Sequence, residues 1–553
     1  MPNKSTDPVF QLIKSLTRSE KRHFRLFTDR PGAAEGLKFI QLFDALDALD
    51  AYDEDRIVTQ VPALKRAQLA NLKANLYRQL LGSLRVYHAG QNPDIQLHEQ
   101  LDYARVLYNK GFYQQSLRML EKTKLAAQQA ELPHVALLAL DFEKLIESQY
   151  ITRSLKDRAE TLATEALDTV THLVRTHELS NTALRLYGFY LKAGHARNQA
   201  DHERITAFFR ANMPGALAAD STFFEKLYFY QAHVWYHTLN QDFRACYRYA
   251  QKWVDLFEAA PPLKDTQAML YIKGLHNLLA ALFNLQYYSK FTEVLQRLED
   301  FAANQTRRAS PNTDTLLFQY IYTNRINAYF LEARFTEGLE IIPELLENLA
   351  LHRSQLDVHR TLVFYYKIAS LYFGSGQFRK AIEYLNLIID QKDLSLREDL
   401  QGFARILNLV AHYEAGDDAS LEYQVRSVYH FLGKMDDQQP MQVEIFRFLR
   451  RVGNIAPGQL KDEFSKLKDK LVEIYANPYD RRPFLYFDLI SWLESKIAGV
   501  PVQDVMRRKF LKMRCGGGGI RKFRRGFAGP RRRNGGVSLG ATKMTRLDGC
   551  LQR

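Results

Sequence analysis

The feature that most constrains the fold is a short turn of Gly or polar residues, followed by an aromatic residue, that recurs between amphipathic segments. Its clearest copy lies in residues 361–394. The run Gly374–Gly376 ends one apolar stripe there, because Gly adopts positive φ without the steric cost that other residues carry. A second stripe follows from Phe378 to Ile388, so the segment predicts two antiparallel helices. The first stripe has the i, i+3, i+4, i+7 spacing of one helical face and consists of Tyr365, Ile368, Ala369 and Tyr372.

Turns of this kind recur at a regular step. From Phe243 onward the steps are 45, 47, 43 and 40 residues. The 130 residues between Tyr113 and Phe243 have room for two further units, with turns near 153–155 and 194–196. Residues 91–455 are therefore predicted to be a row of helix pairs, each of which buries its apolar face only by stacking on its neighbours. The positions that follow the turns are Tyr113, Phe243, Tyr288, Phe335, Phe378 and Asp418.

The unit at 361–394 resembles the tetratricopeptide repeat, a helix-turn-helix unit of about 34 residues. Gly376 and Phe378 match the turn pair of that family, and Ala381 matches its small residue in the second helix. The closing Pro is absent, and the longer step lies in the range of HEAT-type repeats. The resemblance implies an all-α fold, a right-handed α-solenoid of antiparallel helix pairs. Its concave groove, lined by first helices, would be the binding surface.

Residues 1–90 and 456–512 are expected to form helical caps, which shield the ends of such an array. The N-terminal region predicts helices over 8–16, 19–28, 37–49 and 64–87. A helix-turn-helix DNA-binding domain is the alternative for this region, but a recognition helix needs one exposed basic face. The cations of the longest helix are instead spread around it: Lys65, Arg66, Lys73, Arg78 and Arg85.

Polar residues recur on the predicted first helices, beside the core stripe. Asn side chains offer donors and an acceptor to a peptide backbone, and Lys can pair with a carboxylate. We therefore expect these residues to line a groove for an extended peptide or another protein; the alternative is that they are ordinary solvated positions. They are Lys273, Asn277, Asn324, Asn327, Lys367 and Asn408.

No pattern of catalytic, cofactor-binding or metal-binding residues stands out. Phosphate-binding Gly loops, paired C-x-x-C and H-E-x-x-H are all missing from the sequence. His233 and His237 have i, i+4 spacing without the Glu or a third ligand, which favours packing over a metal site. The three Cys exclude a disulfide framework, and no run approaches the roughly 18 apolar residues of a membrane span. We therefore expect a cytoplasmic, non-enzymatic protein without cofactor or membrane partner.

The basic charge of the chain is confined to its C-terminal end. Residues 507–553 carry 15 Lys and Arg against one Asp, which equals the whole net charge of +14. Residues 513–553 are Gly/Arg-rich and lack apolar periodicity, so they are predicted to be disordered. If this tail is native, it is a candidate for binding RNA or DNA through phosphate contacts. The abrupt change near Arg514 also fits a shifted reading frame, which is the interpretation we favour.

These patterns predict a scaffold or adaptor that binds an unidentified protein or peptide through the concave face of a helical-repeat array. The alternative is a regulator that binds nucleic acid through its N-terminal helices or its basic tail. The sequence does not identify the partner, the pathway or the oligomeric state.

Overall fold

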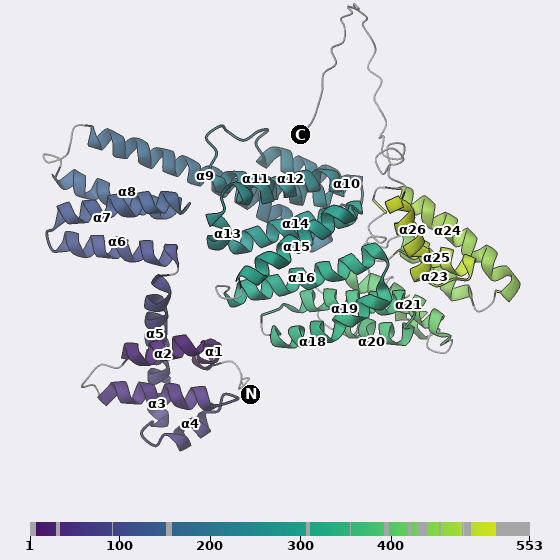
Figure 1. Cartoon of the computed structure of the whole chain (residues 1–553), viewed down its shortest axis with the longest axis horizontal. Helices are drawn as coiled ribbons and strands as arrows, with labels where there is room; N and C mark the ends of the chain where they lie inside the picture. Colours follow the sequence, from purple (N-terminus) through teal and green to yellow (C-terminus); the bar gives the residue numbers. More distant parts are fainter. Residues whose placement is uncertain are drawn as a thin grey trace, which may run out of the picture.

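The computed structural model is built of helices throughout the residues that it describes (Figure 1). Those residues are 7–28, 34–90, 92–150, 157–305, 310–353, 355–391, 398–417, 423–425, 427–428, 431, 440–452, 455–477, 479–480 and 488–515. The expectations for the tail beyond Cys515, for the turn near 153–155 and for the unit that begins at Asp418 fall wholly or partly outside them. The all-α class predicted from the sequence is confirmed for the described chain.

Five helices form an N-terminal body. They are α1 (Pro8–Ser15), α2 (Arg18–Thr28), α3 (Ala34–Ala48), α4 (Glu54–Gln60) and α5 (Arg66–Ala89), close to the predicted ranges. The side chains of Asp7 and Asp53 accept hydrogen bonds from the first backbone N–H groups of α1 and α4, as expected of N-caps. The rings of Phe24 and Phe43 pack 4.9 Å apart in the core, against a stripe of α5 that contains Leu76. The long helix α5 then leads to the rest of the chain (Figure 1).

The middle of the chain is a row of helices that pack on their neighbours. Core residues are supplied by successive helices, as in the cluster that joins Trp253 of α12 to Leu275 of α14. The helices are α6 (Pro93–Asn109), α7 (Tyr113–Gln129), α8 (Pro133–Tyr150), α9 (Arg158–Ala193), α10 (Gln199–Asn212), α11 (Phe223–Leu239), α12 (Phe243–Ala259), α13 (Pro262–Thr266), α14 (Ala268–Leu285), α15 (Tyr288–Gln305), α16 (Pro311–Glu332), α17 (Phe335–Gly338), η2 (Leu339–Ile341), α18 (Ile342–Leu351), α19 (Val358–Gly374), α20 (Phe378–Ile389) and α21 (Glu398–Ala415).

Among the described residues, the same hydrogen-bonded turn closes seven helices of this row. One residue adopts a left-handed conformation, and the amide of the next residue donates to the carbonyl five residues earlier, which is the Schellman motif. In the best-matching unit Gly376 has φ +82°, and the Gln377 amide lies 2.8 Å from the Tyr372 carbonyl. The sequence reveals the turns with Gly more readily than the others. The left-handed residues are Gly111, Glu131, Gln241, Gln286, Ala333, Gly376 and Gly416.

The region between Tyr113 and Phe243 contains one long helix between the positions of the two predicted turns, of which the turn near 153–155 lies outside the described residues. Helix α9 runs for 36 residues and contains no Pro. Its N-terminal half packs on α8 through Leu162, and its C-terminal half packs on α11 through Leu186. The break predicted near 194–196 is present, since Gly194 ends α9 with φ +68°. One long helix thus serves two neighbouring units.

The last helices extend over one edge of the row instead of packing only on its final pair. They are α23 (Pro440–Arg451), η4 (Pro457–Gln459), α24 (Leu460–Ala476), α25 (Leu489–Ala498) and α26 (Val502–Cys515). The Trp492 indole donates to Glu414 Oε1 at the end of α21 (2.7 Å). The Tyr479 hydroxyl donates to Gln199 at the start of α10 (2.5 Å). The C-terminal bundle therefore spans from α10 to α21.

Helix α14 is long and apolar enough to cross a membrane by length and composition, with a mean hydropathy of 1.2 over 18 residues. Polar residues interrupt this helix, so it is not the continuous apolar run that the sequence was predicted to lack. The helix includes Lys273, Asn277 and Asn284, and it packs against α12, α15 and α16. A buried core helix of a water-soluble protein can have the same length and composition, so these two properties alone do not indicate a membrane span.

Candidate functional site

A chain of hydrogen bonds joins polar side chains of α16 and α19. The Lys367 ammonium donates to Asn327 Oδ1 (2.6 Å), and Asn327 Nδ2 donates to Asn324 Oδ1 (3.4 Å). Asn324 Nδ2 in turn donates to the Tyr320 carbonyl (2.7 Å) and lies 3.3 Å from Nδ1 of His276 on α14. We call this set, together with Lys273, Asn277 and Arg360, the polar cluster. It connects the first helices of three successive units.

The polar cluster is rich in cations. Desolvation lowers the pKa of Lys367 to about 8, and its ammonium lies 5.4 Å from the centroid of the Phe330 ring. Desolvation, with a contribution from nearby Arg360, also lowers the pKa of Lys273. Within the described residues the Lys273 ammonium has no hydrogen bond or ion pair. Arg360 binds Gln319 (2.6 Å) and Asp357 (3.0 Å).

A neutral imidazole lies among these cations. The His276 ring stacks on Tyr320 with centroids 3.8 Å apart and planes 5° apart. Burial, together with the positive charges of Lys367 and Arg360, lowers the pKa of His276 to about 3. The ring is therefore uncharged at neutral pH and adds no cation to the cluster. The polar cluster therefore combines two desolvated ammonium groups, largely buried amide groups and an aromatic stack.

The structure brings together five of the six residues singled out in the sequence. Asn277 donates to the Lys273 carbonyl one turn earlier (2.8 Å), so both lie on the same side of α14. Asn408 lies elsewhere, because it is 1% exposed and donates to Asn386 of the adjoining helix α20 (3.1 Å). Asn324 is 0% exposed, so it holds neighbouring helices together and is not a solvated position. The direction in which these two side chains point depends on the stacking of neighbouring units, which local periodicity does not reveal.

Sequence reasoning missed His276, Tyr320 and Arg360. Arg360 precedes Lys367 by seven residues on α19, which places both on one stripe, so the spacing could have identified it. His276 and Tyr320 carry no comparable signal, since their stacking joins residues of different units.

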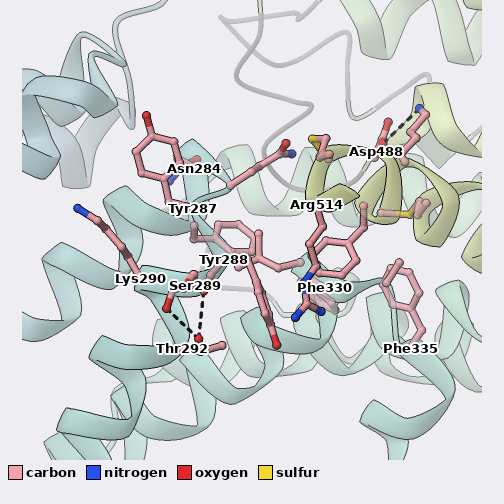
Figure 2. Close-up of a pocket in the computed structure, with 18 of the residues that line it drawn as sticks. Asn284, Tyr287, Tyr288, Ser289, Lys290, Thr292, Phe330, Phe335, Asp488 and Arg514 are labelled. Atoms are coloured by element: carbon pink, nitrogen blue, oxygen red, sulfur yellow. Dashed lines mark hydrogen bonds and ion pairs between the residues drawn. The ribbon is translucent and has the colours of Figure 1, made fainter. Parts of the chain in front are cut away.

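A second candidate site is a cavity of about 980 Å³ between the row and the C-terminal bundle (Figure 2). Its walls come from the turn between α14 and α15, from the turn between α16 and α17, and from α26. Phe510 of α26 packs edge-on against Tyr288, with centroids 5.3 Å apart. Arg507 donates to the Glu332 carbonyl (2.7 Å), and Gln503 accepts from the Thr336 amide (2.9 Å). These contacts hold α26 over the cavity.

Positive charge dominates the ionisable groups of this cavity. Asp488 is the one carboxylate among the described lining residues, and it lies 4.0 Å from the Lys509 ammonium. The Lys290 ammonium donates to the Tyr247 hydroxyl (2.8 Å). The Arg514 guanidinium lies 5.7 Å from the Tyr288 ring centroid and has no carboxylate partner in the described chain. In Figure 2 its side chain runs from α26 toward Tyr288 and Phe330.

The remaining candidates from the sequence are engaged in packing. His233 and His237 both stack with Tyr249, and burial lowers the pKa of each. No group of three or more possible metal ligands occurs among the described residues. In α5, Lys73 is bonded to Asp7 and Glu54 at 2.9 Å, which leaves it unavailable as a phosphate contact. No known protein family, curated protein or solved structure matches this chain.

Proposed function

We propose that this protein is a non-enzymatic scaffold or adaptor of the cytoplasm, which binds a protein or peptide along the first helices of a right-handed, tetratricopeptide-like α-solenoid. The observation that carries the proposal is the polar cluster. It lies across α14, α16 and α19, and its Lys273 ammonium is desolvated without a partner in the described chain. A desolvated cation of this kind gains most from a ligand that brings an anionic or carbonyl oxygen.

The repeated turns support the architecture in the proposal. In the part of the chain that the structure describes, seven helices of the row end in the same left-handed turn, which is expected when one supersecondary unit is used repeatedly. Units stacked in this way present their first helices as one extended surface. An extended peptide would contact several units at once, and the half-buried amide of Asn277 is suited to its backbone. Asn327 is 7% exposed and bonded to Lys367 and Asn324, so it holds the cluster together.

The proposal is tested with an array of immobilised random peptides probed with the full chain. We expect a reproducible set of bound peptides that is lost in Lys273→Glu. The matched control is Lys380→Glu on α20, where the lysine is exposed and paired with Glu383 (2.9 Å). Retention of the set by Lys273→Glu, or equal loss in both variants, would remove the polar cluster from the binding surface. Binding of nucleic acid in a mobility-shift assay, without any peptide binding, would favour the regulator alternative.

A further inference from the structure

We propose that the cavity under α26 binds an amphipathic anion, in which one aliphatic or aromatic body carries a single carboxylate, sulfonate or phosphate. This site is separate from the polar cluster, and the inference goes beyond the proposed peptide binding. It rests on the shape of the cavity, on its apolar walls and on the placement of its charges.

The walls are suited to an apolar body. Phe330, Phe335 and Phe510 contribute rings, and Met506 and Met513 contribute thioethers, which adapt to ligands of irregular shape. Met513 is 52% exposed and Tyr287 is 44% exposed, so apolar surface is accessible at the mouth. A volume of about 980 Å³ lies at the upper end of the range for small-molecule pockets. A single acyl chain or a fused aromatic system fits this space.

The charges are suited to an anionic head group. Lys509 has Asp488 and Glu494 as partners, the latter at 2.8 Å, so its charge is compensated. Arg514 forms no ion pair with a carboxylate in the described chain, and neither does Lys290. The pKa of Lys290 is raised by its hydrogen bond to Tyr247 and, more weakly, by the charge of Glu293 on the same helix. The two cations line the cavity from different elements. An anion placed between the apolar wall and either cation would replace water with a charge-assisted hydrogen bond. A neutral or cationic amphiphile would gain nothing from these two groups.

The test is a titration of the full chain with cis-parinarate, a fluorescent fatty acid, at a concentration where it is monomeric. We expect saturable binding at one site. Arg514→Glu should weaken binding about tenfold or more, as expected for the loss of a charge-assisted hydrogen bond. Arg508→Glu is the matched control, because Arg508 is exposed on the same helix and does not line the cavity. Lys290→Glu, on α15, provides a second test that is independent of the reading frame near Arg514.

Further arms distinguish the source and the chemistry of the ligand. The corresponding alcohol, which lacks the charge, should bind about tenfold more weakly than the acid. The proposal is overturned if the wild-type protein shows no saturable binding, if the alcohol binds as well as the acid, or if Arg508→Glu loses as much affinity as Arg514→Glu. It is also overturned if the chain binds phosphatidylglycerol vesicles but not monomeric fatty acid, because that result assigns the cationic surface to a membrane.

Discussion

A substitution at a left-handed turn can measure the energetic effect of backbone conformation separately from that of side-chain packing. Gly376 has φ +82°, and a Cβ added there would meet no atom within 4 Å. The substitution Gly376→Ala therefore introduces no clash, and its cost comes only from placing a side chain in the left-handed region. The left-handed conformation destabilises the Ala variant, and the lower entropy of its unfolded chain partly offsets this effect. The net destabilisation is about 1 kcal/mol.

The expected effect is local, because a long chain of stacked helices does not unfold in one step. The amide of Gln377 donates to Tyr372 across this turn, so its protection reports on the turn directly. A loss of about 1 kcal/mol corresponds to roughly fivefold faster exchange. Hydrogen exchange with mass spectrometry on peptides that cover the α19–α20 turn measures this change.

Two further variants complete the test. Gly90 also ends a helix and also has open space for a Cβ, but its φ is −72°, so Gly90→Ala should not accelerate exchange. Gln286 is exposed with φ +56°, so Gln286→Gly should slow exchange at the α14–α15 turn by a similar factor. Equal behaviour of Gly376→Ala and Gly90→Ala, or faster exchange in Gln286→Gly, would refute the reasoning.

Three other variants test packing and charge. Gly374→Ala should destabilise the chain by about 1–3 kcal/mol, because the new Cβ overlaps the Phe335 ring; a melting temperature equal to that of wild type would contradict this. Burial raises the pKa of Glu143 from its ordinary value of 4.5 to about 7. Between these two pH values the native state binds more protons than the unfolded state, so stability falls as pH rises through that window. Glu143→Gln lacks this titration, so its stability relative to wild type in urea should be higher at pH 8 than at pH 5, and a pH-independent difference would count against it. Trp492→Phe removes the indole N–H that donates to Glu414, whose side chain is 11% exposed. We expect the free energy of unfolding in denaturant to fall by about 1–3 kcal/mol. An unchanged unfolding midpoint would mean that water replaces the indole as donor.

Local sequence patterns predicted the elements of this fold well. Helix ends at Gly111, Gly376 and Gly416 were recognisable because Gly is the usual residue at a left-handed turn. The turns at Gln286 and Ala333 were found from the aromatic residue that follows. Helix α9 packs on both α8 and α11, which is a tertiary property that local sequence patterns do not reveal.

The candidate sites were harder to predict, since both join residues that are distant in the sequence. The first-helix positions of Lys273 and Lys367 followed from periodicity, but the burial of Asn324 and Asn408 depends on the neighbouring helix. The cavity under α26 combines residues near 288 and near 510. Its existence depends on where the C-terminal bundle packs, and no motif in the chain specifies that position.

The position of the C-terminal bundle has a consequence for the order of events during synthesis. Tyr479 contacts Gln199 across 280 residues, and Arg507 contacts Glu332 across 175 residues. Helices α10 to α21 therefore leave the ribosome and begin to fold before the C-terminal bundle is available to cover the edge of the row on which it packs. The aromatic residues of that edge are covered only once α26 has been translated. A nascent chain arrested before α25 would display this apolar edge to chaperones, although every unit of the row had already been made.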